Sequence, residues 1–243
     1  VMARIAVADG IIVTACTPHI YPGMYENNGP AIRLAVANLQ TCLNDAGMAL
    51  QLTCGADTHI APDLVTGLRD GRVPTLHDSR YFLLEPPHHV APPRLEETVF
   101  QIMAAGYVPV ITHPERLSWI EDRYLTFVDL AGQGAWLQIT AGSLTGRFGS
   151  AAQYWGERLL DEGWVHILAT DSHGVERRPP LLAEGRRAAE RWVGAEEAVH
   201  LVQTRPQGIL NHIDPDRLPA IPALAATPSR SGGSWFKRWF GGR

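Results

Sequence analysis

Histidine and carboxylate side chains follow several apolar runs of this 243-residue chain, at the point where each run ends. Carboxylates that end a buried strand must be paired or coordinated, because burying a bare charge is costly. Imidazoles and carboxylates together are ligands for Zn, Mn or Fe. The pattern therefore predicts a polynuclear metal site, in which one carboxylate could bridge two ions, built from His19, Asp57, Glu85, His113, Asp171 and His173.

Each member of this set also has a plain structural alternative. A lone His19 is more often a hydrogen-bonded core residue than a ligand, and the Asp171–His173 pair resembles many buried Asp–His contacts. The metal site is favoured because several strands end in the same manner. Their carboxyl ends converge on one face of an α/β barrel, where the functional site lies.

Arginines near these residues in the chain indicate an anionic ligand. Arg116 lies in THPER, directly after a predicted strand, and Arg177 and Arg178 lie in RRPP. A guanidinium can grip a phosphate through paired hydrogen bonds. We expect Arg116 and one of the later pair to bind phosphate. The alternatives are an ion pair of Arg116 with Glu115 or another acid, and a solvated loop position for at least one of Arg177 and Arg178.

Other polar residues receive structural roles by default, because their spacing does not mark them as ligands: His59, His77, His88 and His89. Of these, His88 and His89 are close enough to Glu85 to line the mouth of the site. Ser143 could contact a substrate, although capping a turn is favoured. The three cysteines have neither disulfide nor zinc-finger spacing, so a reduced, cytoplasmic setting is expected.

Strand and helix patterns alternate along the chain. Strands are predicted at 11–17, 49–54, 81–85, 107–112, 136–140 and 165–170, and helices at 31–46, 63–70, 94–105, 119–131, 151–162 and 181–203, the last broken near Gly194. This is the pattern of a parallel sheet covered by helices. A closed or nearly closed barrel is favoured over an open sheet, which would spread the polar strand ends along an edge.

The composition fits one globular domain, expected over residues 1–217. A net charge of −4 argues against a dedicated nucleic-acid partner, and no apolar run approaches the roughly 20 residues of a membrane span. Residues 218–234 are rich in Pro, Ala, Ser and Gly and are predicted to be a disordered linker. The tip at 235–243, WFKRWFGGR, suits an anionic membrane surface or a partner groove, or has no role.

Seven segments in order resemble motifs of the polymerase-and-histidinol-phosphatase (PHP) superfamily, and most closely its CpsB/CapC-type capsule-biosynthesis tyrosine phosphatases: TPH, GAD, SRYFLLE, GYVPVITHPERL, LQITAGSLTGRFG, VHILATDSHG and RRPPLL. The resemblance implies a distorted (β/α)7 barrel with up to three metal ions, usually Mn²⁺, with Fe, Co or Zn as alternatives.

The same resemblance implies roles for individual residues. His19 and His173 would share one metal, and Glu85 and His113 another, while Arg116 and Arg178 would bind the phosphoryl group. Asp171 would bind the metal that is also held by the family's N-terminal His-x-His strand. Asp57 stands where the family has a bridging glutamate, so the bridging geometry differs by one methylene.

The implied activity is that of a manganese-dependent protein tyrosine phosphatase. It would dephosphorylate the tyrosine-rich tail of a membrane tyrosine kinase that controls polysaccharide export, in the cytoplasm at the inner face of the plasma membrane. The segment VMARIAVADG resembles the end of a helix, and no His-x-His precedes it, so the chain is expected to lack the first strand. The alternatives are another PHP phosphoesterase, such as a histidinol phosphatase, and an inactive barrel that acts as a binding module. A polymerase accessory role is disfavoured by the acidic balance.

Overall fold

Parallel strands form the centre of the fold in the computed structural model, which describes residues 1–225. The larger sheet has the order β2 (His19–Ile20), β4 (Asp57–His59), β5 (Tyr81–Glu85), β6 (Val108–Thr112), β7 (Trp136–Thr140) and β8 (Ile167–Ala169). A second, two-stranded sheet pairs β1 (Val13–Cys16) with β3 (Gln51–Cys54). All of these pairs are parallel, which confirms the predicted parallel α/β fold.

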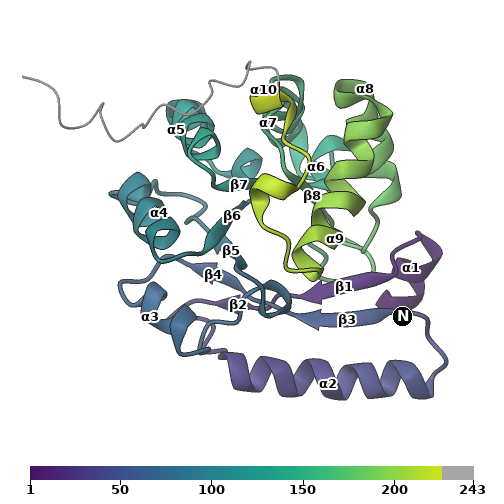
Figure 1. The fold of residues 1–243 in the computed structure, drawn as a ribbon. Helices are drawn as coiled ribbons and strands as arrows, with labels where there is room; N and C mark the ends of the chain where they lie inside the picture. Colours follow the sequence, from purple (N-terminus) through teal and green to yellow (C-terminus); the bar gives the residue numbers. More distant parts are fainter. Residues whose placement is uncertain (226–243) are drawn as a thin grey trace, which may run out of the picture.

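Helices surround these strands (Figure 1). They are α1 (Met2–Ala8), α2 (Gly29–Asp45), α3 (Leu64–Arg69), α4 (Leu95–Ala104), α5 (Ile120–Gly132), α6 (Ala141–Leu144), α7 (Gly149–Asp161), α8 (Ala183–Val199), α9 (Arg205–Leu210) and α10 (Pro222–Ala225). The predicted break in the long helix is confirmed, because Gly194 has φ 80° and ψ 168° inside α8. No helix within residues 1–225 has the length and apolar composition needed to cross a membrane.

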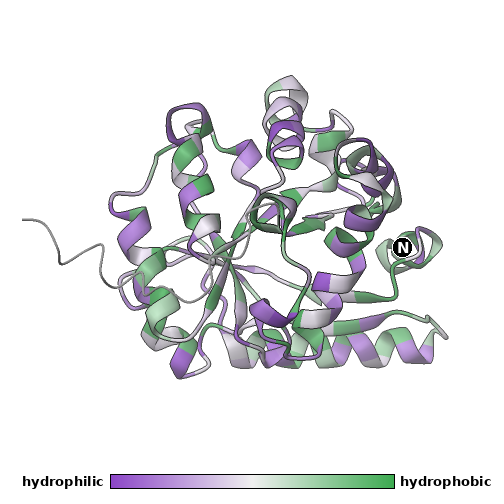
Figure 2. Cartoon of the chain, turned by 45° about the horizontal axis from the view of Figure 1, so that its top comes forward, coloured by the Kyte–Doolittle hydropathy of each residue, from purple (hydrophilic) through white to green (hydrophobic). Residues whose placement is uncertain are grey.

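The core lies around β5, β6 and β7, in which every residue is buried. Burial on both faces explains why these strands appear as continuous apolar runs in the sequence rather than as alternating patterns. Figure 2 shows hydrophobic residues on the central strands and hydrophilic ones on the outer helices. These rigid strands bring Glu85 and the residues that follow β6 and β8 to one end of the sheet.

Short strands β2 and β4 lie beyond the ends of the predicted strands β1 and β3. Pro18 and Gly55 interrupt the regular ladder, but the Asp57 N–H still donates to the Pro18 carbonyl at 3.2 Å. His19 and Asp57 are consequently register partners at the first position of β2 and β4. Among the described residues, no strand pair joins β8 to β1, so hydrogen bonding along the sheet leaves the barrel unclosed there.

The first residues of the predicted linker, 218–225, are described by the structure. Residues 218–225 pack on the domain, where Ile221 is 1% exposed and α10 forms beside Gly163. The Arg205 guanidinium holds this segment by donating to the carbonyls of Pro219 and Ala220 at 3.0 and 3.1 Å. Composition suggested disorder because it does not reveal such a distant anchor. The rest of the predicted linker and the aromatic–basic tip lie outside the described residues.

Candidate metal centre

Glu85, the last residue of β5, lies at the centre of a ring of imidazoles. Its Oε2 is 2.9 Å from His19 Nδ1 and 2.7 Å from His59 Nε2. Its Oε1 is 3.2 Å from His113 Nε2 and 3.4 Å from His88 Nε2. The result is two groups that could each hold a metal ion, His19/His59/Glu85 and Glu85/His88/His113, with the ligand atoms of each group within 4.8 Å of one another. Glu85 belongs to both groups and is therefore placed to bridge two ions.

The donor atoms of this centre fit a cation. His19 Nδ1 and Glu85 Oε2 are buried and have no aligned hydrogen-bond partner among the described residues, although they face each other at 2.9 Å. Leaving buried polar atoms unsatisfied costs about 1–3 kcal/mol each, so such atoms need a partner. A divalent ion between them would satisfy both. Mixed imidazole and carboxylate donors suit Mn, Fe or Zn.

Burial and the close charges shift the pKa values of the cluster. Burial acts to raise the pKa of Glu85, but the imidazoles of His113, His19 and His59 outweigh it and hold that pKa far below its ordinary value. Burial, assisted by the charge of Glu85, raises the pKa of Asp57 well above its usual range. The imidazoles thus favour the ionised form of Glu85, which is the form that binds a cation.

A second cluster lies on the loop after β8. The guanidinium groups of Arg116 and Arg178 both donate to Oδ2 of Asp171, and Arg178 Nε also donates to the Asp171 carbonyl at 3.1 Å. The ring of Phe148 covers both arginines, with its centroid 4.3 Å from the Arg116 Cζ and 5.6 Å from that of Arg178. Two guanidinium groups that converge on one carboxylate oxygen are spaced to converge on a phosphoryl oxygen.

The buried Glu115 fixes the turn that carries Arg116. Its Oε1 accepts hydrogen bonds from the Thr140 N–H at 2.9 Å and from the Ser143 hydroxyl at 2.8 Å. Arg116 in turn donates to the Thr140 hydroxyl at 3.5 Å. Arg116 thus pairs with Asp171 rather than with Glu115. Ser143 is fully buried and stabilises Glu115, so it neither faces the site nor acts as an exposed turn cap.

The structure gathers the six predicted ligands at one end of the sheet. His19, Glu85 and His113 belong to the two ligand groups. Asp57 is buried beside them, with Oδ2 4.0 Å from His113 Nε2 and Oδ1 accepting from the Thr112 hydroxyl at 3.3 Å. Asp171 lies with the arginines, and the His173 ring is 5.8 Å from the ring of His19. The ligand roles of all six residues remain predictions.

His59 and His88, which the sequence analysis assigned to structural roles, both contact Glu85 and belong to the two groups that could hold a metal ion. For His59, the spacing Asp57-x-His59 held a signal, since alternate residues of a strand share a face. No comparable signal marked His88, which a turn after Pro86 and Pro87 brings back toward Glu85. His77 instead contacts Thr53 at 2.6 Å, and His89 is exposed.

Comparisons with known proteins identify the family of this chain. A family model described as "Capsular polysaccharide synthesis, CpsB/CapC" matches residues 1–211. This chain belongs to the CpsB/CapC family. Among curated CpsB/CapC relatives, it is 33% identical over 195 residues to "Tyrosine-protein phosphatase YwqE" of Bacillus subtilis, covering 80% of this chain and 77% of the relative. It is 26% identical over 207 residues to "Tyrosine-protein phosphatase CpsB" of Streptococcus pneumoniae, covering 83% and 85%.

A solved structure from this family has the same fold. It is one of the crystal structures of "YwqE from Bacillus subtilis and CpsB from Streptococcus pneumoniae, unique metal-dependent tyrosine phosphatases". It superposes on this chain with a TM-score of 0.83. The superposition has 31% identity and covers 88% of this chain and 86% of the other. The CpsB/CapC resemblance carried by the sequence motifs is therefore confirmed.

Proposed function

We propose that this chain is a metal-dependent protein tyrosine phosphatase of capsular or exopolysaccharide synthesis. The observation that carries the proposal is the joint presence of a Glu85-centred ligand cluster and of two arginines that converge on one oxygen. The first arrangement suits divalent cations and the second suits a phosphoryl group. Family membership agrees, because the curated relatives are tyrosine-protein phosphatases.

The finer features of the proposal rest on the same residues. Mn²⁺ fits the mixture of imidazole and carboxylate donors, with Fe, Co or Zn as alternatives. For the architecture we propose a PHP-type distorted (β/α)7 barrel, in which no strand pair joins β8 to β1 among residues 1–225. The proposed substrate is the phosphotyrosine tail of a membrane tyrosine kinase, met in the cytoplasm at the inner face of the membrane.

In hydrolysis, the Glu85–histidine cluster and the two arginines would have different roles. Glu85 and the surrounding histidines would hold metal ions, which would supply Lewis acidity and an activated water. Arg116 and Arg178 bind the phosphoryl oxygens and stabilise the charge that develops on them. Glu115 keeps Arg116 in place through Thr140. Tyrosinate, whose conjugate acid has a pKa of about 10, is a far better leaving group than a serine alkoxide and needs no strong general acid.

The test is Mn²⁺-dependent phosphate release from an aryl phosphate by the purified chain. Replacing Arg178 with Ala should lower kcat/KM about 100-fold or more, because a charge that stabilises the transition state is lost. Arg177→Ala is the matched control: Arg177 is exposed, and its replacement should leave activity unchanged.

Full activity of a variant with both His113→Ala and Arg116→Ala would overturn the assignment. A substrate panel separates the alternative: strong preference for alkyl over aryl phosphates would indicate another PHP phosphoesterase, such as a histidinol phosphatase.

A further inference from the structure

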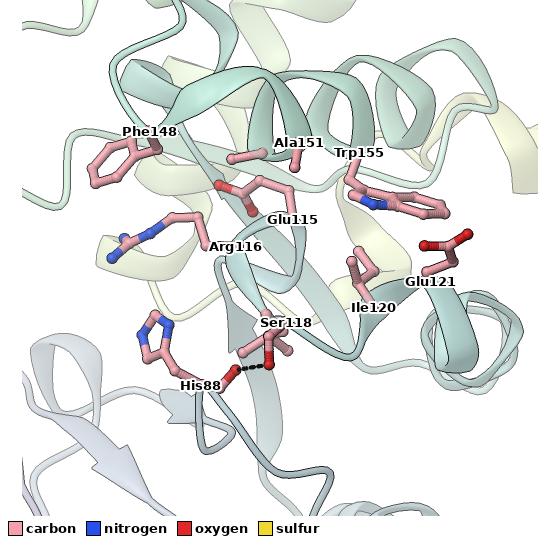
Figure 3. Close-up of a pocket in the computed structure, with 11 residues that line it drawn as sticks. His88, Glu115, Arg116, Ser118, Ile120, Glu121, Phe148, Ala151 and Trp155 are labelled. Carbon is pink, nitrogen blue, oxygen red and sulfur yellow. Dashed lines mark hydrogen bonds between the residues drawn. The ribbon is translucent and has the colours of Figure 1, made fainter.

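A pocket of about 340 Å³ adjoins the phosphate-binding arginines. It lies between the turn that carries Arg116 and the first half of α7 (Figure 3). Arg116, His88 and Phe148 stand at one end, and Trp155 and Glu121 at the other. One end of the pocket therefore lies beside the guanidinium of Arg116 and the imidazole of His88, and the pocket extends away from both.

Polar and apolar groups share the walls of this pocket about equally. Leu117 and Ile120, which are 2% and 3% exposed, line it together with Ala151 and Ala152 of α7. The Trp155 ring at the far end is held by Tyr124, whose centroid is 5.4 Å away. Because Trp155 is fixed in place by its packing, the pocket is largely formed without a ligand. Its volume is at the lower end of the ~300–1,000 Å³ typical of ligand sites, which leaves room for one flat ring and its stem.

We propose that this pocket receives the aromatic ring of the phosphoester whose phosphoryl group is bound by Arg116 and Arg178. The inference rests on the proposed function and names the residues that select its substrate. A phosphoryl group and its aryl group are directly bonded, so their binding sites must be adjacent, and Arg116 belongs to both. Phe148, whose ring lies against the Arg116 guanidinium, also lines the pocket and offers an aromatic contact to an incoming ring.

The pocket explains a preference for tyrosine over serine phosphate. A phenyl group reaches the apolar side chains of the walls and removes their surface from water. The short alkyl stem of a serine or threonine phosphate leaves the pocket filled with water. Discrimination then arises from contacts made by the ring, while the arginines bind either phosphoryl group equally.

The test compares binding of phenylphosphonate and methylphosphonate, neither of which is hydrolysed, by calorimetry with Mn²⁺ present. The wild-type chain should bind phenylphosphonate roughly tenfold more tightly. Ala151→Leu fills the pocket from an exposed position on α7 and should abolish that preference without changing the dissociation constant for methylphosphonate. Ser150→Leu adds a leucine at the neighbouring exposed position, which does not line the pocket, and should retain the preference.

Phe148→Leu provides a second variant and should reduce the preference at the entrance. Absence of a preference in the wild-type chain, or an equal effect of Ala151→Leu on both ligands, overturns the pocket assignment. Failure of the wild type to hydrolyse any phosphoester, with the binding preference intact, overturns the phosphatase function and leaves the pocket as an aryl-phosphonate site.

Discussion

At the residue scale, the metal centre depends on the position of Glu85 among four histidines. Each of its carboxylate oxygens lies close to two imidazoles. His19 and His59 lie in strands β2 and β4 and His113 follows β6, whereas His88 lies three residues beyond Glu85 in the connection after β5. A mutation of His88 therefore tests whether this residue binds the metal together with Glu85.

Replacing His88 with Ala should weaken Mn²⁺ binding at least tenfold, because the group Glu85/His88/His113 would lose one of its three donors. Isothermal titration calorimetry of the metal-free chain would measure the change. His89→Ala is the matched control, since this neighbour is exposed and belongs to neither ligand group. Equal affinities for Mn²⁺ in the two variants would show that His88 is not a ligand.

At the scale of elements, the turn that carries Arg116 depends on close packing between helices α6 and α8. A Cβ placed on Gly185 of α8 would lie 2.4 Å from the Ala141 Cβ and 2.8 Å from its Cα. The helices approach this closely only because residue 185 has no side chain. Since α6 directly follows β7 and carries Ser143, the contact also holds the support of Glu115 in place.

Gly185→Ala should therefore lower the free energy of unfolding by about 2–3 kcal/mol, because the backbone of Ala141 must move. At Gly132, the last residue of α5, an added methyl group would meet nothing within 4 Å, so Gly132→Ala should be neutral or stabilising by up to about 1 kcal/mol. Urea denaturation monitored by circular dichroism would compare the two midpoints. A similar midpoint for both variants would contradict the close packing of α8 on α6.

At the scale of the whole molecule, two buried residues connect the last strand to the C-terminal segment. His166 precedes β8, and its Nδ1 accepts a hydrogen bond from the Leu137 N–H at 3.1 Å, so the ring is neutral. Arg205, which is fully buried, pairs with Glu197 at 2.6 Å and donates to the His166 carbonyl at 3.3 Å. Burial, assisted by the charge of Arg205, lowers the pKa of His166 to about 3.

This shift predicts acid-sensitive stability. Between the unfolded pKa of about 6.5 and the folded value of about 3, the unfolded chain binds more protons than the folded one. The free energy of unfolding should therefore fall as pH decreases below about 6.5, by about 2 kcal/mol at pH 5.

His166→Asn keeps an acceptor near the Nδ1 position and removes the titration. Urea denaturation at pH 7.5 and pH 5 should show a smaller pH-dependent loss in this variant than in the wild type. His89→Asn, at an exposed position, is the control. Parallel pH profiles for wild type and His166→Asn would refute a contribution from His166.

The sequence by itself determined the order of six strands and of the main helices between them, but not the short strands β2 and β4. Runs such as YFLLE and WLQIT are mostly apolar, and glycines or prolines end the elements between them, so these signals are local. The positions of His19, Glu85 and His113 directly after such runs also predicted which of them converge, because parallel strands end on the same side of a sheet.

Only the tertiary structure decided which side chains meet there. His88 reaches Glu85 through the turn after Pro87, and Arg116 turns toward Asp171 instead of the neighbouring Glu115. The packed segment at 218–225 depends on Arg205 in the same way. Contacts of this kind join residues through distances and directions set by the packing of several elements, and no local pattern of residue types records them.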